Sequence, residues 1–301
     1  MPELPFLEIL AENLAAAVSG RRIEAIEIRQ PALLRQATPS AASFHGEYLS
    51  HPSRVGKYLV FETESRRAIV LHLMRLGRLS VVAPKSAGEG GALRGAAKRG
   101  KSSGVPPRNV SARFVFDDGS ELRLIEHGTE KRARLWLVDD LDAVEELREI
   151  GPDPTRGGLT REAFAAAVRA ASRQLKSFLT DQRAIAGIGN GLADEILYEA
   201  RLSPLQLTGN LSDEEMRGLY EAMGSVVERQ VALLRESAGG KLPQKEPVEH
   251  YVVHDHKGEP CPRCGTPIAW ISYAERDTFY CPGCQTGGVA LKDRRLSKLL
   301  K

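Results

Sequence analysis

Residues 257–285 read KGEPCPRCGTPIAWISYAERDTFYCPGCQ and contain two Cys-x-x-Cys pairs, Cys261 with Cys264 and Cys281 with Cys284. The sequence has no other cysteine. Each pair brings two thiolates to one metal ion, and a second pair at this separation completes a tetrahedral four-cysteine zinc site. Sulfur fills all four positions, so we expect one structural zinc per chain. The metal would supply the folding energy of a segment too small for its own core.

Other interpretations of the cysteines are disulfides, reduced free thiols or a redox pair. Disulfides are rare in the cytosol, where we expect this chain. Both pairs lie among turn residues rather than at the start of a helix, which argues against a redox pair.

The composition is that of an ordinary globular protein. The chain has 301 residues, 42% of them hydrophobic, with 42 Lys and Arg against 39 Asp and Glu. This excludes a wholly disordered or collagen-like chain, and the length suggests two domains. No apolar run reaches the roughly 18 residues that span a bilayer. Glu3 and Glu8 stand where a secretory signal would be basic, so we expect a cytoplasmic protein without membrane association.

The first 140 residues predict one helix followed by an antiparallel β-sandwich. Leu7, Leu10, Leu14 and Val18 recur at helical spacing, and Gly20 marks the end of that helix. β-type runs follow at residues 23–28, 58–62, 68–73, 79–82, 110–116, 121–125 and 135–138. Residues 84–109, rich in Gly, Ala, Ser and Pro, carry six basic residues and one acid. They predict a mobile basic loop, which either attracts a polyanion or is a solvated insertion without a role.

From about residue 141 the pattern becomes helical. We expect helices over residues 141–149, 160–171, 174–181, 192–200 and 212–237, the last beginning with a capping box of Ser212 and Glu215. The turn GIGN at 187–190 precedes one of them. Glycines leave N–H groups unobstructed, and the start of a helix favours a phosphate. An ordinary helix–helix turn is the commoner explanation of such a sequence.

Four motifs, taken in order, resemble those of one known family. They are MPELP at 1–5, GKYL at 56–59, GIGN at 187–190 followed by Glu195, and the cysteine segment. On these motifs the chain resembles the formamidopyrimidine-DNA glycosylase and endonuclease VIII (Fpg/Nei) family, apart from the basic insertion.

The resemblance implies an α+β fold. An N-terminal helix and an antiparallel β-sandwich would be followed by a helical helix-two-turn-helix domain with a C-terminal β-hairpin zinc finger. We expect a catalytic domain over residues 1–140, a DNA-binding domain over residues 141–240 and a four-cysteine zinc finger over residues 250–288.

The resemblance also implies that Pro2, exposed when Met1 is removed, is the nucleophile. A secondary amine is a good nucleophile when unprotonated, and α-amino groups titrate near pH 7.7–8.0, roughly. Its attack on the sugar C1′ would expel a damaged base and leave a Schiff base, after which β-elimination cleaves the strand. Glu3 matches the catalytic carboxylate, and Lys57 matches a lysine that contacts the phosphate beside the lesion. Taken alone, Glu3 is a first-turn helix acid and Lys57 a solvated strand-edge lysine.

Two further residues match phosphate contacts of the family. Asn190 matches the phosphate-binding asparagine of the helix-two-turn-helix element. Arg276 matches the zinc-finger arginine, whose guanidinium suits bidentate phosphate binding. The partner implied is double-stranded damaged DNA, bound by a monomer.

The chain departs from the family at three places. The family usually begins PELPEVE, but Phe6 replaces a carboxylate here. Members fill the space of the flipped base with a methionine, an arginine and an aromatic residue. Met74 stands one place before the methionine position, which is occupied by Arg75, and Arg132 could serve as the arginine. Ala133 takes the aromatic position and cannot wedge a base stack. Met74 as an ordinary core residue is the alternative.

The segment before the cysteines is short for the family. Its length favours the endonuclease VIII side, whose substrates are more often oxidised pyrimidines. His254 and His256 alternate on a predicted short strand and would share a face. They form either a second metal site or, more commonly in such a place, two surface histidines beside DNA.

The sequence leaves three hypotheses about function. The first is a base-excision-repair DNA glycosylase and AP lyase for oxidised bases. The second is a non-catalytic or lyase-only relative that binds damaged, abasic or bent DNA, as Phe6 and Ala133 allow. The third, a zinc-ribbon scaffold for RNA or protein, is disfavoured by the N-terminal Pro-Glu pair and the GIGN turn.

Overall fold

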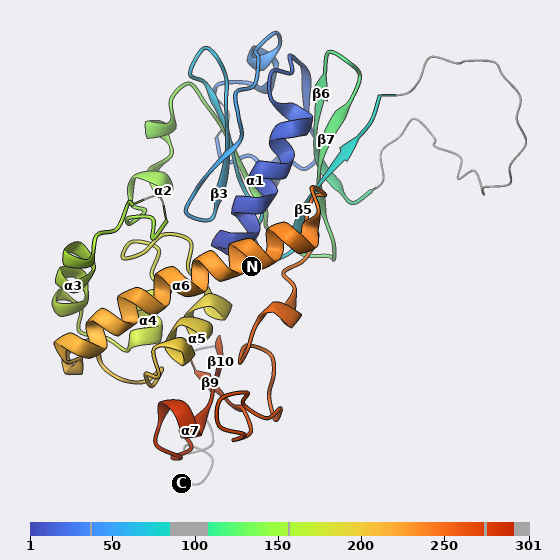
Figure 1. Ribbon diagram of the computed structural model, residues 1–301. Coiled ribbons are helices and arrows are strands. Elements are labelled where there is room, and N and C mark those ends of the chain that lie inside the picture. Colours follow the sequence, from blue (N-terminus) through green and yellow to red (C-terminus); the bar gives the residue numbers. More distant parts are fainter. Residues whose placement is uncertain (37, 85–107, 156, 274–275, 292–301) are drawn as a thin grey trace, which may run out of the picture. The chain divides into compact units, whose positions relative to one another are not determined.

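The computed structural model describes residues 1–36, 38–84, 108–155, 157–273 and 276–291 (Figure 1). The basic loop at 84–109 therefore falls almost wholly outside the described residues. The chain divides into two compact units. One contains Met1, Ala11–Ser53 and Tyr58–Val144, and the other contains Pro2–Leu10, Arg54–Lys57 and Glu145–Lys301. No helix among the described residues qualifies as a membrane span.

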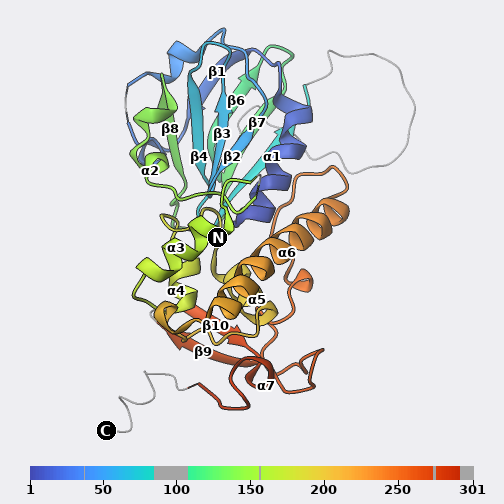
Figure 2. The ribbon, with the colours of Figure 1, turned by 60° about the vertical axis from the view of Figure 1, so that its left-hand side comes forward.

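The strands described for the first unit form two sheets, ordered β1–β6–β7–β5 and β2–β3–β4–β8 (Figure 2). The strand pairs with a defined register are antiparallel. The strands are β1 (Ile23–Ile28), β2 (Ser53–Val55), β3 (Tyr58–Glu62), β4 (Ala68–His72), β5 (Gly77–Val82), β6 (Val110–Phe116), β7 (Glu121–Glu126) and β8 (Arg134–Val138).

The core of the first unit lies between these sheets. Ile23, Phe114 and Leu122 from one sheet and Phe61 and Ile69 from the other line one small apolar cavity. Burying apolar faces of two antiparallel sheets against each other makes a β-sandwich, so the predicted fold class is confirmed. Sequence analysis missed β2, because three residues are too few to show alternation.

The second unit is mainly helical and includes a β-hairpin between its last two helices. Its helices are α2 (Glu145–Arg148), α3 (Arg161–Ala170), α4 (Leu175–Leu179), α5 (Asn190–Glu199), α6 (Asp213–Ala238) and α7 (Pro282–Gln285), with strands β9 (Ala269–Tyr273) and β10 (Arg276–Tyr280). Helix α1 (Leu4–Val18) contributes its first residues to this unit and the rest to the other. Short 3-10 helices are η1 (Pro31–Leu33), η2 (Ala41–Phe44), η3 (Leu141–Ala143), η4 (Thr208–Asn210) and η5 (Val248–His250).

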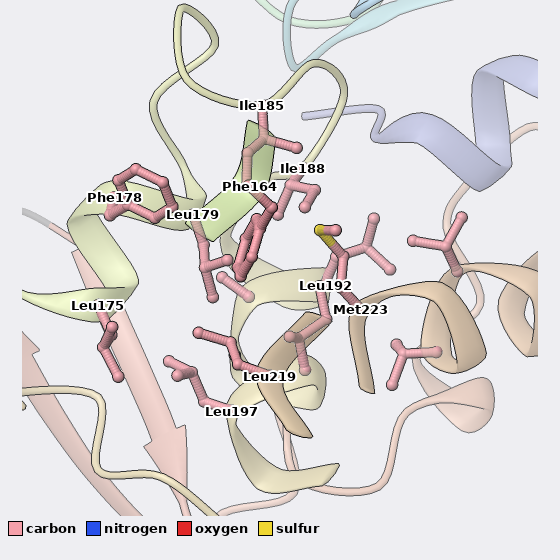
Figure 3. Close-up of a cluster of buried hydrophobic side chains, with 14 of the residues drawn as sticks. Phe164, Leu175, Phe178, Leu179, Ile185, Ile188, Leu192, Leu197, Leu219 and Met223 are labelled. Carbon is pink, nitrogen blue, oxygen red and sulfur yellow. The ribbon is translucent and has the colours of Figure 1, made fainter. Parts of the chain in front are cut away.

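Helices α3, α4, α5 and α6 bury a common core (Figure 3). Phe164 and Phe178 meet edge to face there, with ring centroids 6.1 Å apart. Leu4, at the start of α1, is fully buried in the same core. The core therefore fixes the first residues of the chain within the second unit.

Local signals in the sequence explain how α6 begins and ends. The predicted capping box is present: the Ser212 side chain accepts the Glu215 N–H, and the Glu215 carboxylate accepts the Ser212 N–H. Gly239 ends the helix with a left-handed φ of 53°. The single helix predicted over residues 141–149 is wrong. A 3-10 turn and the four-residue helix α2 occupy it instead.

Candidate active site

Backbone contacts and packing fix the start of the chain. The Leu4 N–H donates to the Gly187 carbonyl at 3.0 Å, and Pro2 is buried. Met1, by contrast, is 47% exposed. Removal of Met1 would thus leave the Pro2 nitrogen as the amino terminus of a segment that is already held in place.

The Glu3 carboxylate binds the N-terminus of α5. It accepts the backbone N–H groups of Gly189 at 2.9 Å, Gly191 at 2.9 Å and Leu192 at 3.0 Å. The helix dipole favours a negative charge there. A side chain at position 189 would displace the Glu3 carboxylate, because a Cβ there would lie 2.3 Å from one of its oxygens. The sequence allowed either an ordinary helix–helix turn or a phosphate site here, and a carboxylate of the chain itself occupies these N–H groups.

A second carboxylate, that of Glu246, lies beside Glu3. Its Oε1 accepts the Glu3 backbone N–H at 2.7 Å. Burial raises the pKa of Glu246 to about 7, and the negative charge of Glu3 raises it as well. Burial and the charges of Glu3 and Glu246 also raise the pKa of Tyr251 well above its usual value. Sequence analysis missed Glu246 because 243 positions separate it from Glu3.

Lys57 lies in the turn between β2 and β3 and is only 5% exposed. That burial excludes the solvated strand-edge lysine. Arg54, which the sequence did not indicate as a site residue, stabilises the turn. Its guanidinium contacts Glu8 at 3.0 Å, Asp153 at 2.8 Å and the Gly56 carbonyl at 3.1 Å. Lys57 therefore presents its charge from a fixed backbone.

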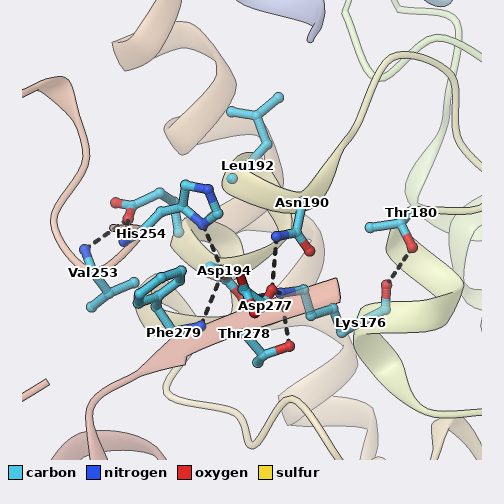
Figure 4. A network of polar contacts seen from close by, with 12 residues as sticks. Lys176, Thr180, Asn190, Leu192, Asp194, Val253, His254, Asp277, Thr278 and Phe279 are labelled. Atoms are coloured by element: carbon cyan, nitrogen blue, oxygen red, sulfur yellow. Dashed lines mark hydrogen bonds and ion pairs between the residues drawn. The ribbon is translucent and has the colours of Figure 1, made fainter. Parts of the chain in front are cut away.

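Asn190, the first residue of α5, contacts β10 (Figure 4). Its Nδ2 donates to the Asp277 carbonyl at 2.7 Å, and Lys176 Nζ donates to the same oxygen at 2.8 Å. Lys176 also pairs with Asp194 at 2.6 Å. Among the described residues, the buried Oδ1 of Asn190 has no hydrogen-bond partner.

Asp194 connects α5 to the hairpin and to His254. Its Oδ2 accepts the Phe279 N–H at 3.1 Å and lies 2.8 Å from His254 Nδ1. Burial lowers the pKa of His254, but the hydrogen bond and charge of Asp194 outweigh it and the pKa is raised. His256 instead contacts Glu259 at 2.9 Å. The predicted strand with two histidines on one face is wrong: the segment is a turn and bend, and each ring has its own carboxylate.

Glu195 holds the segment that leads to the zinc module. Its buried carboxylate accepts the backbone N–H groups of Val252 at 2.9 Å, Val253 at 2.8 Å and His254 at 3.0 Å. Burial raises its pKa, although these hydrogen bonds oppose that effect. Three such bonds fix the path of the segment on which Tyr251 lies.

Two predicted DNA contacts lie in the first unit. Met74 is half-buried in the turn after β4, with a left-handed φ of 51°. The Arg132 guanidinium is exposed and pairs with Glu130 at 2.6 Å. Glu126 accepts the N–H groups of Arg132 and Ala133, both at 2.8 Å, and Ala133 is buried. Glu126 thus fixes the backbone of this loop, and the Arg132 side chain is exposed to solvent.

The four cysteine sulfurs fit a zinc ion. They lie within 4.8 Å of one another, with Cys261 Sγ 3.8 Å from Cys284 Sγ and Cys264 Sγ 3.4 Å from Cys281 Sγ. Tetrahedral zinc with Zn–S bonds near 2.3 Å separates its sulfurs by about 3.8 Å. All four cysteines are free, which excludes the disulfide interpretation, and the clustering of their sulfurs supports one structural zinc. Between the cysteine pairs, Arg276 lies at the start of β10, opposite Tyr273; its side chain lies outside the described residues.

We expect the purified protein to contain one zinc ion per chain, measured by atomic emission. Cys281→Ser should lose the zinc, because three thiolates cannot close the tetrahedron, and hydrogen exchange at β9 and β10 should accelerate. Ser225→Ala, on the exposed side of α6, is the control and should keep full zinc content. Full zinc occupancy in the Cys281 variant would contradict the assignment.

Three family models match the chain. They are the formamidopyrimidine-DNA glycosylase N-terminal domain over residues 1–129, its H2TH domain over residues 150–239, and the zinc finger found in FPG and IleRS over residues 258–287. A formamidopyrimidine-DNA glycosylase of Symbiobacterium thermophilum is 32% identical over 306 residues, covering 98% of this chain and 93% of that protein.

Solved structures share the fold. The MutM (Fpg) protein of Thermus thermophilus is 29% identical, with a TM-score of 0.77 over 96% of this chain and 100% of its own. MutM in complex with DNA containing carbocyclic 8-oxo-G is 25% identical, with a TM-score of 0.79 over 95% of this chain and 100% of its own.

Proposed function

Because the chain belongs to the formamidopyrimidine-DNA glycosylase family, we propose that it excises oxidised bases from duplex DNA with Pro2 as nucleophile and then cleaves the strand. It is a DNA glycosylase of base excision repair. The observation that carries the proposal is the placement of Pro2: buried, fixed by its neighbour Leu4, and followed by a carboxylate bound to the α5 N-terminus.

The proposed reaction uses groups within the second unit. The unprotonated Pro2 nitrogen bonds to C1′ while the C1′–base bond breaks. The base leaves with the electron pair and is neutralised by the proton that the Pro2 nitrogen loses. Glu3 delivers a proton to the sugar ring oxygen as its bond to C1′ opens, giving a cationic Schiff base. That cation acidifies the C2′ proton. Loss of this proton expels the 3′ phosphate and cuts the strand.

We propose that the remaining site residues hold the DNA. Lys57, Asn190 and Arg276 would bind phosphates, and Met74 and Arg132 would enter the space left by the flipped base. The position of Asn190 at the first residue of α5 and the turn that Arg54 stabilises beside Lys57 support the phosphate roles. Zinc would take no part in the chemical reaction. Bound to the four cysteines, it would stabilise the hairpin that carries Arg276.

The role of Asn190 predicts a graded loss of DNA affinity. Asn190→Ala should weaken binding to a duplex with an abasic-site analogue about tenfold, because one phosphate hydrogen bond is lost. Asn190→Asp should weaken it further, because a carboxylate repels the phosphate. Fluorescence anisotropy at fixed salt measures both. Wild-type affinity in the aspartate variant would contradict a phosphate contact at this position.

Borohydride trapping tests the proposed function. A lyase becomes covalently attached to an abasic-site duplex, whereas a relative that only binds damaged DNA shifts its mobility without attachment. The lesion panel should include 8-oxoguanine, as in the DNA bound to MutM, and oxidised pyrimidines, which the short segment before the cysteines favours. Excision of none of these lesions, with DNA binding intact, would favour the binding-only alternative.

We further propose a modular organisation and setting. Residues 1–140 would form the catalytic domain, residues 141–240 the helix-two-turn-helix domain and residues 250–288 the zinc finger. The protein would act as a monomer on chromosomal DNA in the cytoplasm. Light scattering with and without a lesion duplex measures the stoichiometry.

A further inference from the structure

Glu246 brings a carboxyl group to the first peptide bond of the mature chain. Its Oε1 is 2.7 Å from the backbone nitrogen of Glu3. That nitrogen is joined to the Pro2 nitrogen through the Pro2 carbonyl carbon and Cα. Standard bond lengths place these two nitrogens no more than about 3.7 Å apart. The Glu246 carboxyl therefore lies no more than about 6.4 Å from the proposed nucleophile, a distance that a proton can cross through one or two waters.

The helix that follows Pro2 offers no second acid at position 6. Phe6 is buried, so this position supplies an apolar ring where the family usually has a carboxylate. Glu3 serves the sugar ring oxygen in the proposed reaction, so the proton of the Pro2 nitrogen needs a second acceptor. Glu246, from the segment between α6 and η5, supplies an acid beside Pro2 that position 6 lacks.

We propose that Glu246 is the proton-transfer group for Pro2, accepting the imino proton when the nucleophile bonds to the sugar. The inference rests on the proposed function, because it requires Pro2 to be the nucleophile. It assigns an acid–base role to a residue that lies 243 positions from Glu3 in the sequence.

At an abasic site, the proton transfer accompanies formation of the Schiff base between Pro2 and the sugar aldehyde. The Pro2 nitrogen bonds to the aldehyde carbon C1′, and the π electrons of the carbonyl move to oxygen. Glu246 takes the proton from nitrogen and passes it to that oxygen, giving a neutral carbinolamine. The nitrogen lone pair then expels the hydroxyl, which leaves as water with a proton from solvent. The product is the cationic Schiff base, and Glu246 is again a carboxylate.

Burial and the surrounding charges together set the pKa of Glu246. Burial raises the pKa of Glu246 to about 7, the charge of Glu3 adds to that rise, and the positive charges at the start of the chain and on Lys57 oppose it. The charge of Glu246 in turn raises the pKa of the Tyr251 phenol. A group that titrates near neutral pH can both accept and return a proton under working conditions.

The test is the single-turnover rate of cyanoborohydride trapping on an abasic-site duplex between pH 6 and pH 8. Glu246→Gln keeps an oxygen that can accept the Glu3 N–H but cannot take a proton. We expect it to trap about 100-fold more slowly than wild type at pH 8. The ratio of wild-type to variant rates should fall about tenfold between pH 8 and pH 6, because protonated Glu246 no longer accepts a proton.

Two variants complete the experiment. Glu246→Asp should recover part of the rate together with its pH dependence, and Glu249→Gln, an exposed neighbour, should behave as wild type. A Glu246→Gln rate within twofold of wild type, or a ratio that does not change with pH, would overturn the proposal. If wild type itself fails to trap, the proposed function fails; if only the glutamine variant is unaffected, this inference alone fails.

Discussion

Displacing the Pro2 nitrogen from the chain terminus should abolish trapping on an abasic-site duplex. Pro2→Leu is the sharpest variant, because a large second residue prevents removal of Met1 and leaves the nitrogen of residue 2 in an amide. An amide nitrogen has no lone pair available for attack. Pro2→Gly keeps a terminal amine but loses the ring that fixes its direction, so we expect a fall of at least about 100-fold.

Single-turnover trapping, with DNA affinity measured in parallel, checks both Pro2 variants. Affinity should change little, because the nucleophile contacts DNA only during reaction. The Pro5→Ala variant is a control for loss of a proline near the terminus and should keep most of the rate. Trapping of Pro2→Leu at the wild-type rate would mean that another amine is the nucleophile.

Glu3→Gln should reduce base excision about 10²–10⁴-fold, the range for loss of a general acid or base. The amide cannot donate a proton to the ring oxygen, and its NH2 group faces the N–H groups of Gly189, Gly191 and Leu192, which the carboxylate accepts. The melting temperature should fall as well, because α5 loses its N-terminal charge partner.

Single-turnover excision of the preferred lesion, with thermal melting, separates the two effects of the Glu3 substitution. Glu228→Gln, on an exposed part of α6, should change neither. Leu192→Ala should lower stability through the core while keeping the Glu3 contact, which is made to its backbone. If Glu3→Gln lost excision only in proportion to its stability, Glu3 would be structural.

The sequence predicted what depends on neighbours in the chain. The two Cys-x-x-Cys pairs encode the zinc site within one short segment, and the capping box of Ser212 and Glu215 encodes the start of α6. Short runs of β-forming residues between turn signals predicted the sandwich strands in the same way, although β2 was too short to be recognised. Such features need only local geometry, so one sequence is sufficient to find them.

What the sequence could not show depends on the folding of distant segments. Glu246 meets Glu3 only because the segment after α6 returns to the start of the chain. The GIGN turn has the geometry of an anion site, but nothing local reveals that Glu3 fills it. Likewise, the position of the His254 ring is set by its contact with Asp194, and the strand predicted from its own segment is absent. Each of these three positions depends on contacts between residues that are distant in the sequence.

The most direct test of the account is to map the trapped adduct by mass spectrometry. After trapping on an abasic-site duplex and digestion with nuclease and trypsin, the sugar remnant should lie on the peptide beginning at Pro2 and ending at Arg21. Fragment ions should place it on the proline nitrogen, with Met1 absent. A remnant on Lys57, or a trapped chain that still begins with Met1, would contradict the account.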